Sequence, residues 1–337
     1  MLRYIVRRLL AIPFLILGVA TLAFILGHGI KGDPLASLLS ERQMGNAEVV
    51  AAVKARWGLD KSLPEQYVAY IMNLLKGDLG TSFRTKRPVL EDILERLPAT
   101  LELVIAAMIF GSSLGIALGI IAAYYKNRRI DDVSRLFALI GSSTPIFWSG
   151  LIMLFIFSVK LRILPGPGRL DASTEIPLFV TGMFTFDALI AGDFKKFLEA
   201  LSHLILPACI LGWAVMGIIS RIVRASMLDV LNQEYILTAR AKGAREPRVV
   251  VNHALRNVMI PTLTIIGFSF AYLITGAVLT ETIFAWPGVG SYAVGSARSL
   301  DYPAIIGVTI VGAAAFLFTN LVTDISYAIA NPKIRIG

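Results

Sequence analysis

Six long apolar runs constrain this chain more than any other feature of its sequence. Each run has 21 to 24 residues and contains no Lys, Arg, Asp or Glu; the runs are Leu9–Ile30, Leu103–Tyr125, Leu136–Val159, Ala200–Ser220, Asn257–Thr280 and Tyr302–Thr323. A helix needs about 20 apolar residues to cross a hydrocarbon core about 30 Å thick. We therefore expect an all-α, polytopic membrane protein with six transmembrane helices.

Two segments test this count of crossings. The first run follows a basic start, as in a signal peptide, but it is too long for a signal core and no small-residue cleavage pattern follows, so we expect an uncleaved helix. A seventh candidate, Pro177–Gly192, is interrupted by Asp187. Its longer uncharged part has only about ten residues, which is typical of a surface element and not of a membrane span.

The distribution of basic residues predicts the orientation. With six spans, both termini lie on one side together with residues 126–135 and 221–256. That side has 16 Lys and Arg in 62 residues, whereas the other side has 16 in 125. Basic residues gather in short cytoplasmic loops, so we expect a bacterial inner-membrane protein with both termini in the cytoplasm. Orientation therefore explains the net charge of +9, and no nucleic-acid partner is expected.

The same count divides the chain into three parts. Residues 1–96 hold the first helix and a small extracytoplasmic insert, residues 97–329 hold five helices and a cytoplasmic loop at 221–257, and residues 330–337 form a cytoplasmic tail. Within the insert, Ser62 and Glu65 have the spacing of a capping box, and Gly77 is expected to end the helix that follows. We expect this insert to pack on the ends of the spanning helices, because it is too small to be stable alone.

Few residues suggest chemistry in this chain. There is no Walker A loop, and the three histidines lack the spacing of a metal site, so no cofactor or metal is expected here. The sequence Gly111-Ser112-Ser113-Leu114-Gly115 matches the pattern of a hydrolase elbow. Because it lies inside an apolar run and continues to Gly119, it is better interpreted as a small-residue face for close helix packing.

Three acids lie at or just past the ends of apolar runs. Acids at membrane depth are candidates for a solute pathway or gate, which makes Glu102 and Asp324 the first candidates and Glu281 a weaker one. A position at a helix end also allows a simpler interpretation, in which the carboxylate reaches water or lipid headgroups.

The loop after the fourth run carries the most specific pattern. Met227, Leu231, Tyr235 and Thr238 predict that the fourth helix continues to about Lys242, where Gly243 suits a left-handed helix end. Pro247 suits the first turn of a second helix, whose apolar face is Val250, Ala254 and Val258. From the pattern alone, two helices lying on membrane lipid are as well supported as a contact with another protein.

Several motifs in this chain resemble the peptide branch of the ABC importer permeases. Thr238, Ala239 and Gly243 are similar to the EAA-x3-G loop of that family, although only Leu255 matches the continuation of that motif. Further matching stretches cover nearly the whole chain: YIVRRLL (4–10), GDP (32–34), GDLGTSF (77–83), TPIFWSG (144–150), EYILTARAKG (234–243), LTETIFAWPGVG (279–290) and NPKIR (331–335).

This resemblance implies a type I ABC importer. Such an importer has two permease subunits, two separate ATPase subunits that bind ATP and Mg²⁺, and an extracytoplasmic solute-binding protein. It also implies that the basic loop is the coupling segment that contacts an ATPase. The implied contact residues are Glu234, Thr238, Ala239, Lys242, Gly243 and Leu255.

The predicted function is therefore a membrane permease for dipeptides or short oligopeptides, which catalyses no reaction itself. A permease for nickel or another small solute shares nearly all these motifs and remains an alternative. A membrane enzyme with Ser113 as nucleophile lacks spaced His and Asp partners. A lipid-anchoring protein without a transport role leaves the motif matches unexplained.

Overall fold

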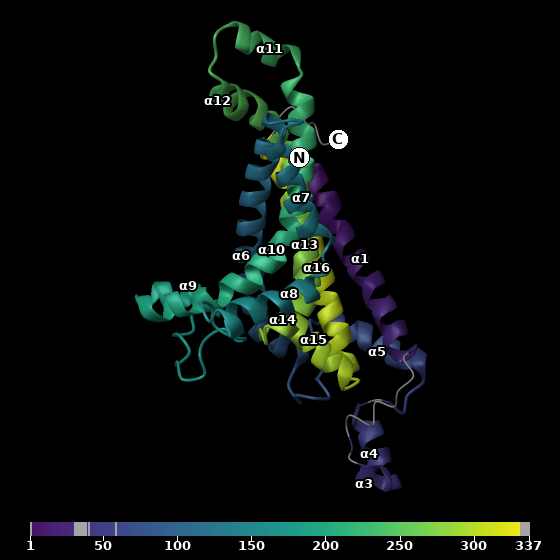
Figure 1. The fold of residues 1–337 in the computed structure, drawn as a ribbon. Helices are drawn as coiled ribbons and strands as arrows, with labels where there is room; N and C mark the ends of the chain where they lie inside the picture. Colours follow the sequence, from purple (N-terminus) through teal and green to yellow (C-terminus); the bar gives the residue numbers. More distant parts are fainter. Residues whose placement is uncertain (1, 30–38, 40, 58, 331–337) are drawn as a thin grey trace.

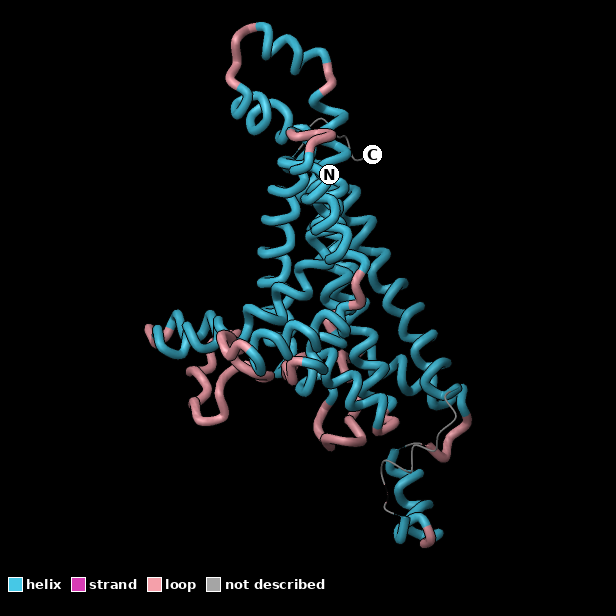
Figure 2. The backbone as a smooth tube through the Cα atoms, in the orientation of Figure 1, coloured by secondary structure: helices cyan, strands magenta, loops and turns pink. Residues whose placement is uncertain are grey.

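Helices make up the regular structure of the part of the chain that the computed structural model describes, namely residues 2–29, 39, 41–57 and 59–330 (Figure 2). The matched motifs at 32–34 and 331–335, and nearly all of the predicted tail, lie outside these residues. In chain order the helices are α1 (Leu2–Gly29), α3 (Glu41–Met44), α4 (Ala47–Trp57), α5 (Leu63–Leu75), α6 (Val89–Tyr124), α7 (Arg129–Ser143), α8 (Ile146–Leu154), η1 (Phe155–Lys160), α9 (Phe184–Ile190), α10 (Phe194–Leu231), α11 (Glu234–Ala241), α12 (Glu246–Arg248), η2 (Val249–Leu255), α13 (Arg256–Gly276), α14 (Val278–Ile283), α15 (Val289–Arg298) and α16 (Tyr302–Ala330).

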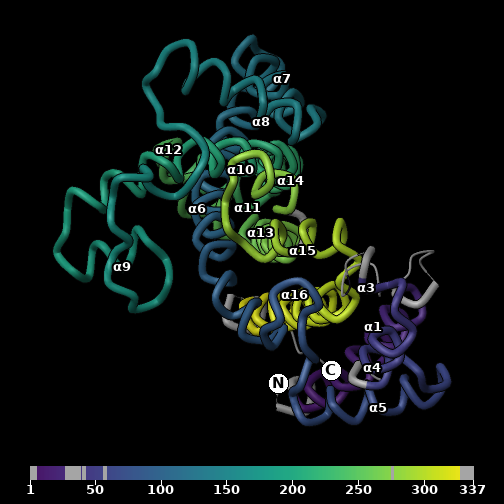
Figure 3. Tube along the Cα trace, turned by 90° about the horizontal axis from the view of Figure 1, so that it is seen from below, coloured from purple at the N-terminus to yellow at the C-terminus, as the bar shows by residue number. Residues whose placement is uncertain are grey.

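The long helices form a bundle with α6, α10 and α13 at its centre (Figures 1 and 3). Helix α7 packs on one side of this centre, while α16 packs on α13 and α1 packs on α16. Helices α11 and α12 project at one end of the bundle, and α1 begins and α16 ends toward that same end (Figure 1). Helices α5, α9, α14 and α15 lie toward the opposite end. This arrangement agrees with an even number of crossings.

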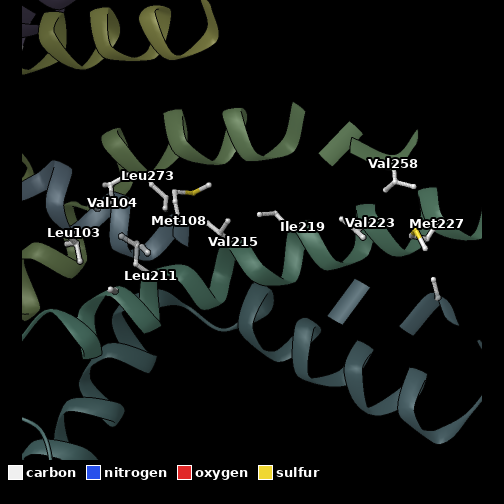
Figure 4. Packing of buried hydrophobic residues seen from close by; sticks show 14 of the residues in the cluster. Leu103, Val104, Met108, Leu211, Val215, Ile219, Val223, Met227, Val258 and Leu273 are labelled. Atoms are coloured by element: carbon white, nitrogen blue, oxygen red, sulfur yellow. The ribbon is translucent and has the colours of Figure 1, made fainter. Parts of the chain in front are cut away.

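The main core runs along α10 and explains the long apolar run in that helix. Leu211, Val215, Ile219 and Val223 are at most 3% exposed and point into the space between α6 and α13 (Figure 4). Burial of each such side chain stabilises the bundle, but in a membrane the fit between helices matters more than removal from water. The core therefore depends on how closely α6 and α10 approach one another.

Glycines on α6 allow this close approach, as their spacing predicts. A Cβ added at Gly111 would lie 2.6 Å from the carbonyl oxygen of Gly212, and one added at Gly119 would lie 2.7 Å from Cβ of Val223. Atoms this close would force the helices apart. The interpretation of Gly111, Gly115 and Gly119 as a packing face is confirmed.

The third predicted span, Leu136–Val159, is sharply bent. Helix α7 ends at Ser143, and the pair formed by α7 with α8 and η1 is bent by 102°. Thr144 has φ −80° and ψ 131° because the proline after it disfavours a helical conformation. Five helices are long and apolar enough to cross a membrane within the described residues, and the bent pair makes a sixth crossing if it counts as one span.

Helix α6 begins 14 residues before the predicted span. Its first turns carry Asp92, which is fully buried and accepts hydrogen bonds from the hydroxyls of Thr85 and Tyr292 and from Arg96. Charges end an apolar run in the sequence, but here they are paired inside the protein and the helix continues through them. Helix α10 likewise begins before its apolar run.

Pro177–Gly192 does not form a spanning helix. Residues 161–183 are irregular, and the only helix that follows before residue 192 is the seven-residue α9. Asp187 accepts hydrogen bonds from the backbone N–H groups of Val180, Thr181 and Gly182. Although burial opposes it, the hydroxyl of Thr181 and these N–H groups hold the pKa of Asp187 below its ordinary value. The charge that interrupts the apolar run thus organises a loop.

The insert between α1 and α6 packs on the bundle through α5. The carboxylate of Glu65 accepts hydrogen bonds from both the backbone N–H and the hydroxyl of Ser62, so the predicted capping box is present. Tyr67 and Tyr70 contact Phe24 of α1, with ring centroids 5.3 and 5.6 Å away. The prediction that the insert packs on the helix ends holds for α5, whereas α3 and α4 extend beyond them (Figure 1).

Candidate functional site

The loop between α10 and α13 projects from one end of the bundle, and its first helix does not continue α10 (Figure 1). Helix α10 ends at Leu231, where the side-chain amide of Asn232 donates a hydrogen bond to the carbonyl of Leu228. This bond takes up a carbonyl that a continuing helix would use. The prediction of one helix to Lys242 is therefore wrong, and α11 starts as a separate helix at Glu234.

Gly243 ends α11 in the predicted left-handed conformation, with φ +80°. The N–H of Ala244 donates to the carbonyl of Ala239 at 3.1 Å, and the N–H of Gly243 donates to the carbonyl of Arg240 at 2.9 Å. These two bonds form a Schellman motif, in which a residue at φ above zero closes the helix. The chain then reverses, and Pro247 lies in the first turn of α12 as predicted.

The inner side of the loop belongs to the main core of the protein. Ile236 of α11 and Val249 and Ala254 of η2 are fully buried, in one cluster with Met227 of α10 and Val258 of α13. The spacing in the sequence pointed to Tyr235 and not to Ile236, because it assumed that α10 and α11 were one helix. Ile236 thus anchors α11 in the core that α10 and α13 also line.

The outer side of the loop exposes the residues that the resemblance assigns to a partner. Glu234, Thr238, Lys242 and Gly243 are exposed, while Ala239 and Leu255 are half-buried; all but Leu255 lie on α11 and the turn after it. Large apolar side chains are exposed among them, since Leu237 is 56% and Tyr235 43% exposed. Arg240 and Glu246 pair across the turn at 2.8 Å.

A partly buried ion pair holds α10, the helix that leads into this loop, against α7. The guanidinium of Arg224, near the end of α10, donates to both carboxylate oxygens of Asp131 in α7, at 2.8 and 2.7 Å. Asp131 also accepts from the N–H of Asn127 and is 1% exposed. Such two-point pairs set geometry as well as energy. No local pattern predicted this pair, because its partners are 93 residues apart.

Glu102 lies in a second buried network, near the opposite end of the bundle. Its carboxylate is 2.5 Å from Nη2 of Arg169 and accepts hydrogen bonds from the N–H and the hydroxyl of Thr185. The Arg169 guanidinium also lies over the rings of Phe184 and Trp286. Burial lowers the pKa of Arg169, and the neighbouring Glu102 opposes that shift. Glu102 is therefore paired inside the protein and does not reach headgroups or water.

Asp324 does not lie near Glu102. It pairs with Arg8 and so joins α16 to α1, at the end of the bundle from which the α11–α12 loop projects. The two predicted pathway acids thus belong to separate ion pairs toward opposite ends of the helices.

A groove of about 410 Å³ lies along the bundle between Glu102 and Asp324. It is formed by α6, α13 and α16, and its walls are mostly apolar with hydroxyl groups from Ser112, Thr319 and Thr323. Ile105, one turn after Glu102, contributes to one part of the wall, and Ser326, just past Asp324, to another.

Comparison with known proteins agrees with this architecture. Residues 115–336 match the family described as "Binding-protein-dependent transport system inner membrane component", and residues 1–104 match the N-terminal part of such membrane components. The chain belongs to this family of transport permeases.

Relatives of this permease share its full length. It is 42% identical to the probable D,D-dipeptide transport system permease protein DdpB of Escherichia coli K12. The match covers 98% of this chain and 97% of that relative. It is 43% identical to the di/tripeptide transport system permease protein DppB of Pseudomonas aeruginosa, with 99% of each chain covered. It is 38% identical to the glutathione transport system permease protein GsiC of Salmonella choleraesuis, again with 99% of each covered.

The elbow pattern of this permease lies in helical structure. Ser113 is in the middle of α6, and its hydroxyl donates a hydrogen bond to the carbonyl of Ile109 at 2.6 Å. A hydrolase elbow needs a strand, a sharp turn and a helix, so the pattern carries no nucleophile here. The chain is an inner-membrane component of a transport system.

Glu281, the weaker pathway candidate, lies inside the permease, in α14 toward the end of the bundle opposite the α11–α12 loop. It is fully buried and accepts hydrogen bonds from the hydroxyl of Thr100 at 2.6 Å and the N–H of Ser291 at 2.8 Å. Burial raises the pKa of Glu281, while these hydrogen bonds oppose the rise. Gly290 leaves room for the carboxylate, since a Cβ there would lie 2.9 Å from Oε2.

Proposed function

We propose that this permease serves an ATP-driven importer of dipeptides or short oligopeptides. The observation that carries the proposal is the full-length similarity to permeases whose names specify D,D-dipeptides, di- and tripeptides, and glutathione. These solutes share a short peptide-like backbone. An importer of nickel or another small solute is the alternative within the same family.

The proposed partners are a second permease, two ATPases that carry the ATP and Mg²⁺, and a solute-binding protein. The family description itself names dependence on a binding protein. Exposed Leu237 and Tyr235, on a loop whose inner side joins the core, support an ATPase contact at α11. In this proposal, movement of the ATPases shifts α11 and thereby α10 and α13.

Transport with purified components tests the substrate. The permease pair, the ATPases and the binding protein are placed in liposomes, and uptake of a labelled dipeptide, a labelled tripeptide and ⁶³Ni²⁺ is measured with and without ATP. ATP-dependent uptake of a peptide, with no uptake of nickel, is expected. Uptake of nickel alone would support the alternative, and uptake of neither would reject both.

We further propose that both termini and the 221–257 loop are cytoplasmic and that residues 97–329 form the transport domain. The basic residues on the side of the termini support this orientation. Single cysteines at Asn252 and Ser173, which are both exposed, test it in a Cys209→Ser background. A membrane-impermeant thiol reagent applied to intact cells should label the cysteine at 173 and not the one at 252. The opposite labelling contradicts the orientation.

The pathway role of Glu102 and Asp324 remains a proposal. The groove between Glu102 and Asp324 supports it, because a mostly apolar wall with a few hydroxyl groups is typical of a small-molecule site. The ion pairs with Arg169 and Arg8 give both acids a structural role that a test has to separate from transport.

A further inference from the structure

A cluster of three possible metal ligands lies at the start of α10, outside the features described above. Glu199 and His203 are four residues apart on one face of α10, and Asp171 comes from the irregular segment 161–183. One ligand atom of each residue lies within 4.8 Å of the others. The side chain of His203 is 2% exposed and that of Asp171 is 67% exposed, so the cluster opens to the surface on one side only.

The hydrogen-bond partner of His203 determines how its ring faces the cluster. Nδ1 lies 3.2 Å from the carbonyl oxygen of Gly168. A carbonyl only accepts hydrogen bonds, so Nδ1 carries a hydrogen and donates it. Nε2 is buried and has no hydrogen-bond partner among the described residues, yet it lies 3.5 Å from Oδ1 of Asp171. The free nitrogen is therefore directed at the carboxylates.

This arrangement is the one that a metal-binding histidine adopts. A ligating imidazole usually donates its other N–H to a backbone carbonyl, which fixes the tautomer and leaves a lone pair for the metal. Without a cation, that lone pair and the carboxylate of Asp171 would face each other across 3.5 Å and repel. Either a metal ion or a second proton on the ring removes this repulsion.

We propose that Asp171, Glu199 and His203 bind a divalent transition-metal ion, with Zn²⁺ as the best fit. Around a tetrahedral ion with bonds of about 2.1 Å, neighbouring ligand atoms are about 3.4 Å apart. The 3.5 Å separation of Nε2 and Oδ1 is close to this value. One nitrogen and two carboxylate oxygens suit Zn²⁺ with water in a fourth position, whereas Ca²⁺ and Mg²⁺ prefer oxygen ligands alone.

The surroundings of Glu199 support the same assignment. Its Oε1 accepts a hydrogen bond from the N–H of Asp171 at 3.0 Å, and its carboxylate also accepts one from the hydroxyl of Thr174. Bonds of this kind orient a ligating carboxylate and leave its other lone pairs for the ion. The cluster also needs little movement to close, because Asp171 is exposed and on a loop.

A bound ion would fasten the 161–183 segment to α10. That segment carries Arg169, which pairs with Glu102 of α6. The proposed site therefore stabilises the network around Glu102 from outside it, and it does so whatever solute the permease transports.

Zinc titration of the full-length permease tests the proposal. The protein is purified through a tag without histidines, placed in lipid nanodiscs, treated with EDTA, and titrated with ZnCl₂ against a fluorescent zinc indicator. One saturable equivalent is expected in the wild type. Affinity should fall at least about tenfold in His203→Gln, Asp171→Asn and Glu199→Gln. Glu175→Gln and His253→Gln, at an exposed acid of the same segment and at a histidine of η2, should bind as the wild type does.

The competing arrangement is a doubly protonated His203 paired with Asp171, and it predicts no saturable zinc binding. That result overturns the proposal, as does an affinity that is the same in Asp171→Asn and the wild type. Asp171 is mostly exposed, so its variant should fold even if His203→Gln does not. As a second measurement, ZnCl₂ should raise the melting temperature of the wild type and not that of Asp171→Asn.

Discussion

Substitution of Gly243 gives the sharpest test of the coupling loop. The residue has φ +80°, a conformation that costs a residue with a Cβ about 1 kcal/mol. A Cβ built there meets no atom of the chain within 4 Å, so no clash adds to this cost. Gly243→Ala should therefore leave a folded loop that is weakened only slightly, and Gly243→Asn should be milder still because asparagine tolerates this conformation.

Gly243→Asp adds a charge at the surface proposed to contact the ATPase. A charge forced into an apolar contact without a partner costs several kcal/mol, and each 1.4 kcal/mol reduces affinity about tenfold. We expect Gly243→Asp to reduce ATPase binding by about 100-fold or more, while Gly243→Ala changes it by less than about tenfold. The assay is recovery of the ATPases with the purified permease pair, together with substrate-stimulated ATP hydrolysis.

The chain contains a matched control for this experiment. Gly77 ends α5 with φ +78°, has no atom within 4 Å of an added Cβ, and closes the same motif through the N–H groups of Gly77 and Asp78. It lies toward the other end of the bundle. Gly77→Asp should leave ATPase recovery unchanged. Normal recovery and normal stimulated hydrolysis in Gly243→Asp would refute the coupling assignment, and an equal loss in Gly77→Asp would assign the effect to the fold.

Three further predictions concern buried charges. Arg224→Lys keeps the charge but loses one of the two hydrogen bonds to Asp131. The melting temperature in detergent should therefore fall by several degrees, and substrate-stimulated ATP hydrolysis should fall with it. An unchanged melting temperature and unchanged hydrolysis contradict a positioning role for this pair. Because the pKa of Glu281 is raised in the folded state, its contribution to stability is complete below the unfolded value of about 4.3 and is lost as the pH rises through the folded value. The melting temperature of the wild type minus that of Glu281→Gln should therefore decrease from pH 4 upward, and a constant difference contradicts this reasoning. Glu102→Gln leaves the buried Arg169 unpaired and should destabilise the protein by about 3–5 kcal/mol. If Glu102 also lines the solute route, the double variant Glu102→Gln/Arg169→Gln should recover stability but not uptake. Recovery of both assigns Glu102 a structural role only.

Local sequence patterns predicted the features that depend on neighbouring residues. The apolar runs placed the spanning helices, because a bilayer needs a fixed length of apolar helix whatever surrounds it. Ser62 and Glu65 predicted a helix start, and Gly243 predicted a helix end, since both signals act within about four residues. The glycine spacing on α6 predicted close packing, although it did not show that α10 is the partner.

Patterns failed where a helix ends inside a periodic run or continues past a charge. The long run Leu136–Val159 looked continuous, yet the Thr144–Pro145 step bends it sharply. Met227, Leu231 and Tyr235 suggested one helical face, but the side chain of Asn232 ends α10 first. The second span was expected to begin at Leu103, yet α6 begins at Val89, because a sequence does not show that Thr85, Arg96 and Tyr292 surround the carboxylate of Asp92.

The sequence by itself thus determined a polytopic all-α protein, the projecting basic loop and the family to which it belongs. These follow from the length of the apolar runs, the placement of charged residues and short motifs, all of which are local features of the sequence. Only the tertiary structure decided that Arg224 pairs with Asp131, that Glu102 pairs with Arg169, and that Asp171 meets His203. These pairs join residues 32 to 93 positions apart. The Arg224–Asp131 and Arg169–Glu102 pairs are stable only where attraction and hydrogen bonds offset the cost of taking both charges out of water, and that depends on which helices pack side by side.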